Sequence, residues 1–446
     1  MVAELVALVI FVIMFLLIVL DRIPRQWVTL GCGALMLVLV FGVCMHDGGA
    51  IWDTLNLSAF GQSTFWYGAS ESSGGINWST IVFIAGMMVM VEGMGQVGIF
   101  RWLCLKLAKA VHYRTVPLLV CFMVMAAVLS MFIDSITVIL FLAVASVQLA
   151  RLLKFDPVPL IIAEIFTANL GGAATMSGDP PNIIIGTAMG LTFGDFLQNT
   201  GLIVLVSMVV IVPFFYFAFR KQVATQDEAA RQKAMEMDPK ASIHSWRKFA
   251  LNVGVFLLTV VLLITHAKTG LTVAMVGVIA AVLTLLVNKD PILLLKRVDW
   301  QTVLFFIGLF LAVSGLEQTG VLEAMAQGIA HITGGSLTLM VIIILWLSGI
   351  ASAFVDNIPF AATMVPVITS LSATMGVDLN ALAWTLSMGT DIGGSGTPIG
   401  ASANVAGTAI AAREGYAIGW GRYCKYSAPA AVIVLAISMV MLLLRY

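Results

Sequence analysis

Ala168–Asn182, which reads ANLGGAATMSGDPPN, is the stretch that decides how the rest of the chain is interpreted. It lies between two apolar runs, Pro159–Phe166 and Ile183–Leu191. Its glycines and its proline pair interrupt a helix, because proline lacks the backbone N–H and glycine is entropically costly in a helix. At membrane depth such an interruption must be buried in protein or line a polar cavity. Helices broken in this way are typical of transporter binding sites.

A second copy of the pattern, Thr390–Asn404 (TDIGGSGTPIGASAN), follows 222 residues later. The same offset needs no gap from Trp78 to Gly186, so chance is a poor explanation and we interpret the chain as an internal duplication. The identical pairs include Gly171 with Gly393, Gly172 with Gly394, Thr175 with Thr397, Gly178 with Gly400, Asn182 with Asn404, Asp134 with Asp356, Trp78 with Trp300 and Gly86 with Gly308.

The composition defines the class of protein. Of the 446 residues, 60% are hydrophobic and 10% are charged, whereas a soluble domain carries roughly 25% charged residues. The 23 basic and 23 acidic side chains cancel, so nothing indicates a nucleic-acid partner. We therefore predict an all-α polytopic membrane protein, with the lipid bilayer as its surroundings. The sequence has no nucleophile–base pair, metal-ligand cluster or cofactor fingerprint, which argues against an enzyme and against a cofactor.

The order of apolar and polar segments predicts two repeats, 1–219 and 249–446, joined by a polar linker, 220–248. Each repeat is expected to cross the membrane five times and to contain a re-entrant hairpin and a broken helix. Because five is odd, the repeats lie in opposite orientations. The hairpins are Val116–Ala150 and Leu337–Leu371, the broken helices are Val158–Leu191 and Leu379–Ala412, and the other spans are Glu4–Leu20, Trp27–Cys44, Thr80–Val97, Gly201–Phe219, Ala250–His266, Leu271–Val287, Thr302–Gly315 and Ser427–Leu444.

The distribution of basic residues predicts the sidedness. With both termini outside and the linker in the cytoplasm, only Lys268 and Arg445 of the 23 basic residues lie outside. This bias is the one that orients membrane proteins. We expect an integral protein of a bacterial-type inner (plasma) membrane.

Ionisable side chains at membrane depth are functional candidates, because burying them is expensive. Asp134 and Asp356 are predicted to lie at the two hairpin turns, where they either cap the following helix or, near the broken helices, bind a cation or a proton. The sequence places no Lys or Arg at a similar depth. The candidate ligands of substrate or ion are Asp134, Ser135, Asn169, Thr175, Asp179, Asn182, Asp356, Asn357, Asp391, Thr397, Ser402 and Asn404.

The two halves of this candidate site differ in charge. Asn169 and Asp391 share a repeat position, so Asp391 is predicted to carry the charge-changing step. Asn182 and Asn404 either bind the substrate or cap the half-helices that continue after the breaks. Glu164, about one helical turn before the first break, is either a proton relay or a hydrogen-bonded structural acid. A sodium ion would be held by Asp134, Asn182, Asp356, Asp391 and Asn404.

At these motifs the chain resembles the ion transporter superfamily, which includes arsenite permeases, the melanosomal P protein, citrate and dicarboxylate/sodium symporters and one class of bacterial sodium/proton antiporters. Phe132–Thr137, Gly171–Ile184 and Asp391–Val405 look most like the P protein/arsenite permease branch. The resemblance covers nearly the whole chain. It implies that the hairpins and broken helices form a mobile transport domain beside a scaffold, with an elevator-like movement and a homodimeric assembly.

The chain departs from the symporter branch at the hairpin turns. Those relatives carry Ser-Asn-Thr, whereas this chain has Asp134-Ser135-Ile136 and Asp356-Asn357-Ile358. An aspartate that faces a di- or trivalent organic anion in a low dielectric repels it unless the aspartate is protonated or bound to a cation. This puts uptake of citrate or dicarboxylates in doubt.

We therefore expect an ion-coupled secondary active transporter of a small inorganic or weakly acidic solute, such as arsenite, moved outward against protons. Sodium/proton antiport is the main alternative, since four central aspartates suit it and it needs no separate solute site. Sodium-coupled citrate or dicarboxylate transport is another. A channel fits less well, because hairpins opposed from both sides imply two gates around one site. The coupling ion is predicted to be H⁺ or Na⁺.

Overall fold

The computed structural model describes residues 2–20, 22–68, 75–224, 227–288 and 290–446, and every regular element in these ranges is a helix. The elements of the first half, in chain order, are α1 Val2–Leu20, α2 Arg25–Leu35, η1 Met36–Met45, α3 Gly48–Leu55, η2 Leu57–Gly61, α4 Ser63–Trp66, α5 Trp78–Gln96, α6 Ile99–Ala110, α7 Thr115–Ser130, α8 Ser135–Leu153, α9 Val158–Gly172, α10 Pro180–Met189, α11 Phe193–Gln198 and α12 Thr200–Val223. After α13 Glu228–Met235 and η3 Pro239–Ser242 follow α14 Trp246–Thr269, α15 Val273–Val287, α16 Pro291–Arg297, α17 Trp300–Gln318, α18 Val321–Thr333, α19 Leu337–Phe354, α20 Asn357–Met375, α21 Leu379–Gly394, α22 Ser402–Arg413 and α23 Trp420–Arg445.

Ten helices of the described chain are long and apolar enough to cross a membrane. They differ in part from the predicted crossings. The arms α8, α19 and α20 of the predicted hairpins are among them, whereas the two broken helices are not, because each is divided into shorter pieces. The predicted span Leu271–Val287 forms α15, which has only 15 residues. The predicted linker overlaps its neighbours, since α12 continues to Val223 and α14 begins at Trp246.

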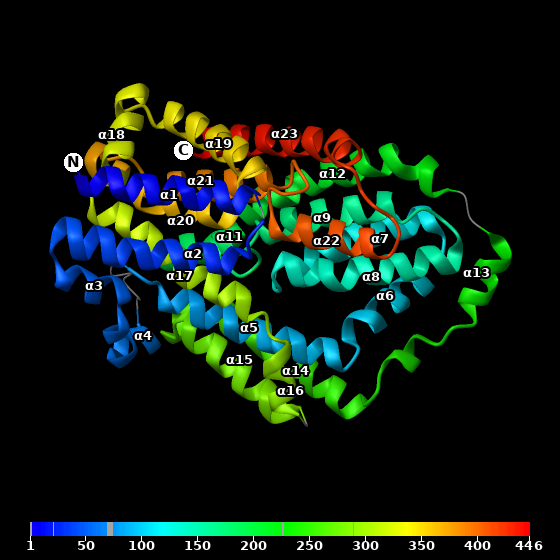
Figure 1. Cartoon of the computed structure of the whole chain (residues 1–446). Helices are drawn as coiled ribbons and strands as arrows, with labels where there is room; N and C mark the ends of the chain where they lie inside the picture. The colour runs from blue at the N-terminus through cyan, green and yellow to red at the C-terminus, as the bar shows by residue number, and fades with distance from the viewer. Residues whose placement is uncertain (1, 21, 69–74, 225–226, 289) are drawn as a thin grey trace.

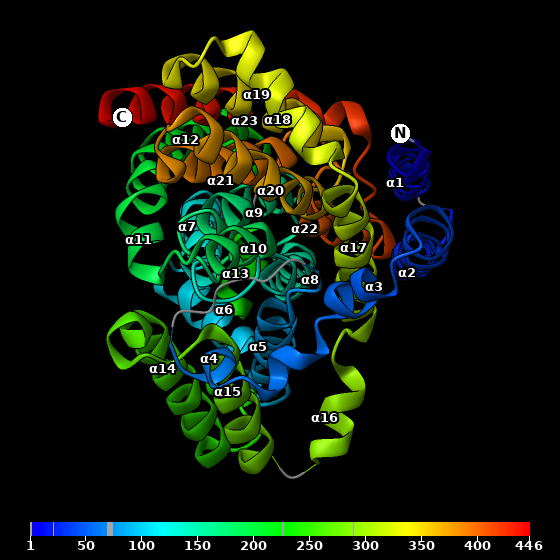
Figure 2. The same cartoon turned by 90° about the vertical axis from the view of Figure 1, so that its left-hand side faces the viewer.

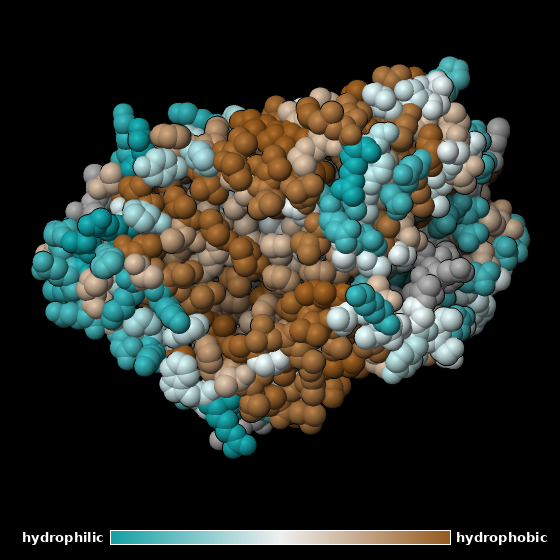
Figure 3. Space-filling model, turned by 180° about the vertical axis from the view of Figure 1, so that it is seen from behind, coloured by the Kyte–Doolittle hydropathy of each residue, from teal (hydrophilic) through white to brown (hydrophobic). Residues whose placement is uncertain are grey.

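The molecule has the surface expected of a membrane protein. Seen from behind, a broad hydrophobic region lies between two ends that carry most of the hydrophilic residues (Figure 3). Both chain termini lie at one of these ends, and α13, in the region predicted as the linker, lies at the other (Figure 1).

The two halves are interlocked through their long helices. Helix α5 of the first half packs along α15 of the second, and α17 of the second packs along α2 of the first. Glycines at equivalent repeat positions allow both approaches: a Cβ on Gly86 would lie 2.2 Å from the carbonyl oxygen of Gly277, and one on Gly308 would lie 2.4 Å from the amide nitrogen of Leu30. The duplication seen in the sequence is therefore accompanied by equivalent packing.

The predicted hairpins and broken helices lie together in the middle of the molecule. Helices α7 and α8 both pack against α9, and α19 and α20 both pack against α21. Viewed from the end that carries the termini, α7–α10 and α20–α22 lie between α1, α2 and α17 on one side and α5, α14 and α15 below (Figure 2). This central group contains every predicted site residue.

Candidate functional site

Each break in a helix is tied to the neighbouring hairpin turn. The Thr175 hydroxyl donates a hydrogen bond to the carbonyl oxygen of Met131, and the Thr397 hydroxyl donates to that of Ala353. The acceptors are separated by the same repeat offset as the donors, so the two breaks are built alike. Both threonine hydroxyls therefore fix the backbone of the hairpin turns in this conformation. Their O–H groups are used in these bonds and cannot donate to a substrate at the same time.

Asn182 and Asn404 brace the breaks from within. The Asn182 amide donates to the carbonyl oxygens of Gly172 and Thr175, each at 3.2 Å. The Asn404 amide donates to Gly394 and Thr397 in the same way, at 2.8 and 2.7 Å. These carbonyls lie at and after the end of the preceding half-helix, where helical acceptors lack partners. The capping alternative is thus wrong in its direction, because these side chains bind the half-helix before the break rather than the one after it.

The two breaks also contact each other. The Asn169 amide donates to the side-chain oxygen of Asn404 at 2.8 Å and to the Ser395 hydroxyl at 3.1 Å. In the opposite sense, the Ser387 hydroxyl donates to the side-chain oxygen of Asn182 at 2.6 Å. The polar groups of both repeats therefore form one buried network where α9 and α21 meet.

Asp179 is held by one residue from each hairpin. Ser135 donates to one carboxylate oxygen at 3.1 Å, and Asn357 donates to the other at 3.2 Å. Ser135 and Asn357 occupy the same repeat position, each directly after the aspartate of its hairpin turn. Two donors directed at a buried carboxyl group stabilise its ionised form.

Asp391 is the exception in this network. It is fully buried, and no described residue makes a hydrogen bond of ordinary length to either of its carboxylate oxygens, although the Asn182 side chain lies close enough to interact with it. It interacts electrostatically with Asp179, and the Asn169 side-chain oxygen also lacks a partner among the described residues. A buried ionised carboxylate without a partner costs several kcal/mol. This conformation therefore accommodates Asp391 best when it is protonated or bound to a cation.

Asp356 contradicts the expectation that no basic residue reaches this depth. Arg25, the first residue of α2, forms an ion pair with its carboxylate at 2.7 Å, and the Ser402 hydroxyl donates to the same oxygen at 2.8 Å. The other oxygen accepts the backbone N–H of Ile358 and so caps α20. The sequence missed Arg25 because it lies directly before an apolar span, whereas the fold brings Asp356 to the start of that span.

Asp134 and Glu164 make no hydrogen bond to this network, although Asp134 interacts electrostatically with Asp179. Asp134 accepts the backbone N–H of Thr137 at 2.9 Å and caps α8, as the capping alternative predicts. Glu164 is fully buried, accepts the Ser146 hydroxyl at 2.5 Å, and leaves its second oxygen without a described partner. The five residues predicted to share a sodium ion are thus distributed over several contacts, and among the described residues no group of three or more His, Cys, Asp or Glu side chains forms a metal site.

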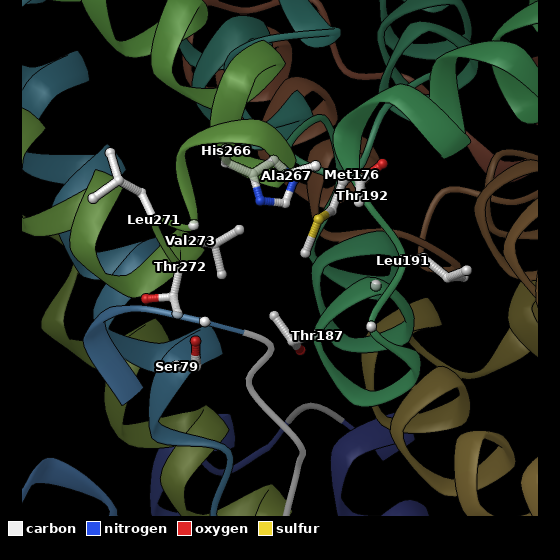
Figure 4. A pocket seen from close by; sticks show the side chains of 14 residues that line it. Ser79, Met176, Thr187, Leu191, Thr192, His266, Ala267, Leu271, Thr272 and Val273 are labelled. Atoms are coloured by element: carbon white, nitrogen blue, oxygen red, sulfur yellow. The ribbon is translucent and has the colours of Figure 1, made fainter. Parts of the chain in front are cut away.

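Two cavities with both polar and apolar residues in their walls lie beside the central group. One, of about 260 Å³, is lined by Arg25, Asp356 and Ser402 together with Asp299 and Gln301 from the region where α17 begins. The other, of about 370 Å³, lies between α10 and the helices α5, α14 and α15, with Thr187, Thr192, His266 and Thr272 among its walls (Figure 4).

Ser387 and Ser395 were not predicted as site residues, although a simple signal marks them. They lie four residues before and four residues after Asp391, a spacing that places side chains on one helix face. Ser395 bonds Asn169, while its repeat counterpart is Ala173, which has no hydroxyl. The Asn169 amide therefore has acceptors in Ser395 and Asn404, whereas Ala173 offers Asp391 no hydroxyl.

An all-helical chain with buried carboxylates gathered where broken helices meet hairpins has the architecture of a membrane transport protein. The chain belongs to the citrate transporter family, because its residues 15–389 match the sequence pattern of that family. It is a membrane transporter rather than an enzyme, and its substrate is a small molecule or an ion.

Relatives and solved structures agree with this family. An uncharacterized transporter of Mycobacterium tuberculosis is 32% identical over 99% of both chains. The human P protein is 27% identical over 83% of this chain and 54% of its own length, so this chain spans about half of it. The fold is similar to that of the YdaH transporter of Alcanivorax borkumensis, with a TM-score of 0.52, 15% identity and 88% of each chain covered. It is also similar to MtrF of Neisseria gonorrhoeae, with a TM-score of 0.55, 11% identity and 88% and 84% of the chains covered.

Proposed function

We propose that this protein is a proton-coupled secondary transporter that moves a small, weakly acidic solute such as arsenite outward, and that Asp391 is the group that takes up and releases the proton. The observation that carries this proposal is the full burial of Asp391 without a hydrogen bond of ordinary length from the described residues, with the Asn182 side chain as its nearby polar neighbour. Asp179, close enough to interact with Asp391, has donors on both oxygens. Such a pair assigns the charge to one carboxyl group and the proton to the other.

The charges around the site favour an uncharged solute. Arg25, the basic residue that reaches the hairpin turns in the described structure, is already paired with Asp356. A solute with two or three negative charges would meet Asp179 and Asp356 without a free cation to balance it. A neutral hydroxyl-bearing molecule such as arsenous acid can instead use the asparagine, serine and threonine groups as hydrogen-bonding partners.

We further propose an elevator-like cycle in which α7–α10 and α19–α22 move against a scaffold that contains α1, α2, α5, α14, α15 and α17. Few polar contacts would have to break in this movement. They include the Arg25–Asp356 ion pair and the Thr80–Thr187 hydroxyl contact at 2.7 Å. A homodimer, inverted repeats 1–219 and 249–446, and a cytoplasmic linker 220–248 in a bacterial-type inner membrane complete the proposal.

Sodium/proton antiport is the second candidate function. It is favoured by the unpartnered oxygens of Asn169 and Asp391, because hard cations take oxygen ligands. In that case Na⁺ and H⁺ would compete for Asp391, and no solute site would be needed.

Inverted membrane vesicles with a pre-formed pH gradient, acidic inside, distinguish these functions. Arsenite, NaCl, LiCl or citrate with and without NaCl is added in turn, and the internal pH and arsenite content are followed. We expect arsenite accumulation that dissipates the gradient, that Asp391→Asn abolishes, and that Asp378→Asn preserves. Asp378 is the matched control, because it is an exposed carboxylate that caps the same helix and asparagine is an equally good cap.

Other outcomes would replace the lead proposal. Gradient collapse by Na⁺ or Li⁺ without any response to arsenite would identify a sodium/proton antiporter. A response to citrate that needs Na⁺ would identify a sodium-coupled citrate transporter. Arsenite transport that persists in Asp391→Asn would remove Asp391 from the coupling step.

A further inference from the structure

A long apolar groove lies on the face of the molecule formed by α7, α11 and α12, which is at the left in Figure 2 and toward the viewer in Figure 3. Its volume is about 790 Å³. Its walls include Val128 of α7 together with Leu205 and Val209 of α12, whose side chains are 50%, 63% and 70% exposed. In a membrane-spanning helix, apolar side chains exposed to this degree face the hydrocarbon of the bilayer.

The floor of the groove belongs to the central group. It is formed by Ala127 and Met131 at the end of α7 and by Gly171 and Ala174 at the first break. These residues are in tight contact, since a Cβ on Gly171 would lie 2.2 Å from the carbonyl oxygen of Ala127. Anything that fills the groove therefore rests directly on the hairpin turn that bonds Thr175.

The groove meets a second apolar cavity at one arginine. The second cavity has a volume of about 360 Å³, and Leu202 and Arg445 line both. Arg445 donates one hydrogen bond to the carbonyl oxygen of Gln198 at 3.0 Å and is exposed. A guanidinium group has five N–H donors in a planar fork, which suits the oxygens of a phosphate.

We propose that the groove and its neighbour hold one anionic phospholipid, with its phosphate at Arg445 and one acyl chain in each cavity. The arrangement argues for this occupant: two apolar cavities diverge from a single basic group at the end of the last span, where basic side chains reach the headgroup region. The chain in the larger cavity packs on Met131 and Ala174, so bound lipid stabilises the first hairpin in the position seen here. If α7–α10 and α19–α22 move as in the proposed elevator-like cycle, on which this step rests, exchange of the lipid controls how readily they move.

Native mass spectrometry of the full chain, released from nanodiscs with equal parts of phosphatidylglycerol and phosphatidylcholine, tests this proposal. We expect one phosphatidylglycerol to be retained, and Arg445→Gln to weaken its retention about tenfold, as for the loss of one charge-assisted hydrogen bond. Val128→Trp, which fills the groove, should displace it. Lys268→Gln and Leu257→Trp are the matched controls, because both sites lie on α14, away from the groove, and are exposed.

Retention of phosphatidylglycerol at the wild-type level by Arg445→Gln or by Val128→Trp would overturn the proposal. Equal retention of phosphatidylcholine and phosphatidylglycerol would exclude the role of charge at Arg445. If Val128→Trp instead converted a dimer into a monomer, the groove would be a contact between two copies of this chain. Arg445→Lys, which keeps the charge, should retain the lipid and shows that the site is folded.

Discussion

At the scale of single residues, the carboxylate of Asp179 accepts hydrogen bonds from both repeats. Ser135 and Asn357 reach it from the two hairpins at equivalent positions, although their side chains differ. A hydrogen bond to a charged group contributes about 1.5–3 kcal/mol. Each donor therefore contributes to keeping Asp179 ionised while both hairpin turns are closed on it.

Removing either donor should impair transport by a similar factor. We expect Ser135→Ala and Asn357→Ala each to reduce gradient-driven transport by about tenfold, because each leaves one oxygen of a buried carboxylate unpaired. Initial rates in reconstituted vesicles, normalised to the amount of inserted protein, measure this. The double variant should lose less than the product of the single effects, since both donors act on one group.

Asn380→Ala is the matched control for the second variant, because Asn380 is exposed at the start of α21. Transport by Ser135→Ala and Asn357→Ala at the rate of this control would contradict the role of the two donors. Effects that multiply without coupling would mean that Ser135 and Asn357 act on different groups.

The sequence marks these residues as candidates but does not reveal their pairing. Asp179 and Asn182 are recognisable because polar residues interrupt an apolar run, and Asp391 because it occupies the position of Asn169. Arg25 carries no such signal, since its partner Asp356 is separated from it by 331 residues. Likewise, nothing in the sequence indicates that the Asn169 amide meets Asn404, because that contact depends on how α9 packs against α21 and α22.

At the scale of elements, two glycines determine how closely the broken helices approach the hairpins. A Cβ on Gly171 would lie 2.2 Å from the carbonyl oxygen of Ala127, and one on Gly393 would lie 2.3 Å from that of Gly349. Backbone atoms cannot be moved aside as a flexible side chain can. Gly171 and Gly393 are identical repeat positions, which explains in physical terms why this pair coincides in the sequence.

We therefore expect Gly393→Ala to destabilise the protein by about 1–3 kcal/mol through overpacking between α19 and α21. Thermal unfolding in detergent, followed by tryptophan fluorescence, measures this as a lowered Tm. Gly421→Ala is the matched control: Gly421 also lies in a helix, but nothing lies within 4 Å of its added Cβ. Because alanine is the better helix former by about 1 kcal/mol, that variant should be as stable as the parent or more stable. A Gly393→Ala protein with an unchanged Tm would show that α19 and α21 separate without cost.

The breaks and the hairpin turns could be predicted because glycine, proline and mid-run aspartate interrupt helices for local reasons. The lengths of the hairpin arms could not. Arms such as α8 and α20, with 19 residues each, are as long as a membrane crossing, so composition alone does not tell an arm from a span. The π-helix Met36–Met45 that continues α2 also has no signal in its uniformly apolar sequence.

At the scale of the whole molecule, the polar ends determine how the chain sits in a membrane. Helix α14 has 24 residues, so it is about 36 Å long and exceeds the hydrocarbon core of roughly 30 Å. The region predicted as the linker precedes this helix and Lys268 lies near its end, so we expect the two on opposite sides of the bilayer. The distribution of Lys and Arg predicts that the linker side is the cytoplasm.

Labelling of single cysteines with a membrane-impermeant maleimide tests this sidedness, on a parent in which the five native cysteines are replaced. We expect Lys268→Cys to react in intact cells, whereas Ala229→Cys in α13 should react only after the membrane is disrupted. Both residues are exposed, so a lack of reaction reflects the membrane and not burial. The parent without cysteine must stay unlabelled under both conditions. The reverse pattern would mean that the protein has the opposite orientation in the membrane and that the proposed export runs in the opposite direction. Reaction of both cysteines in intact cells would mean that α14 does not cross the membrane.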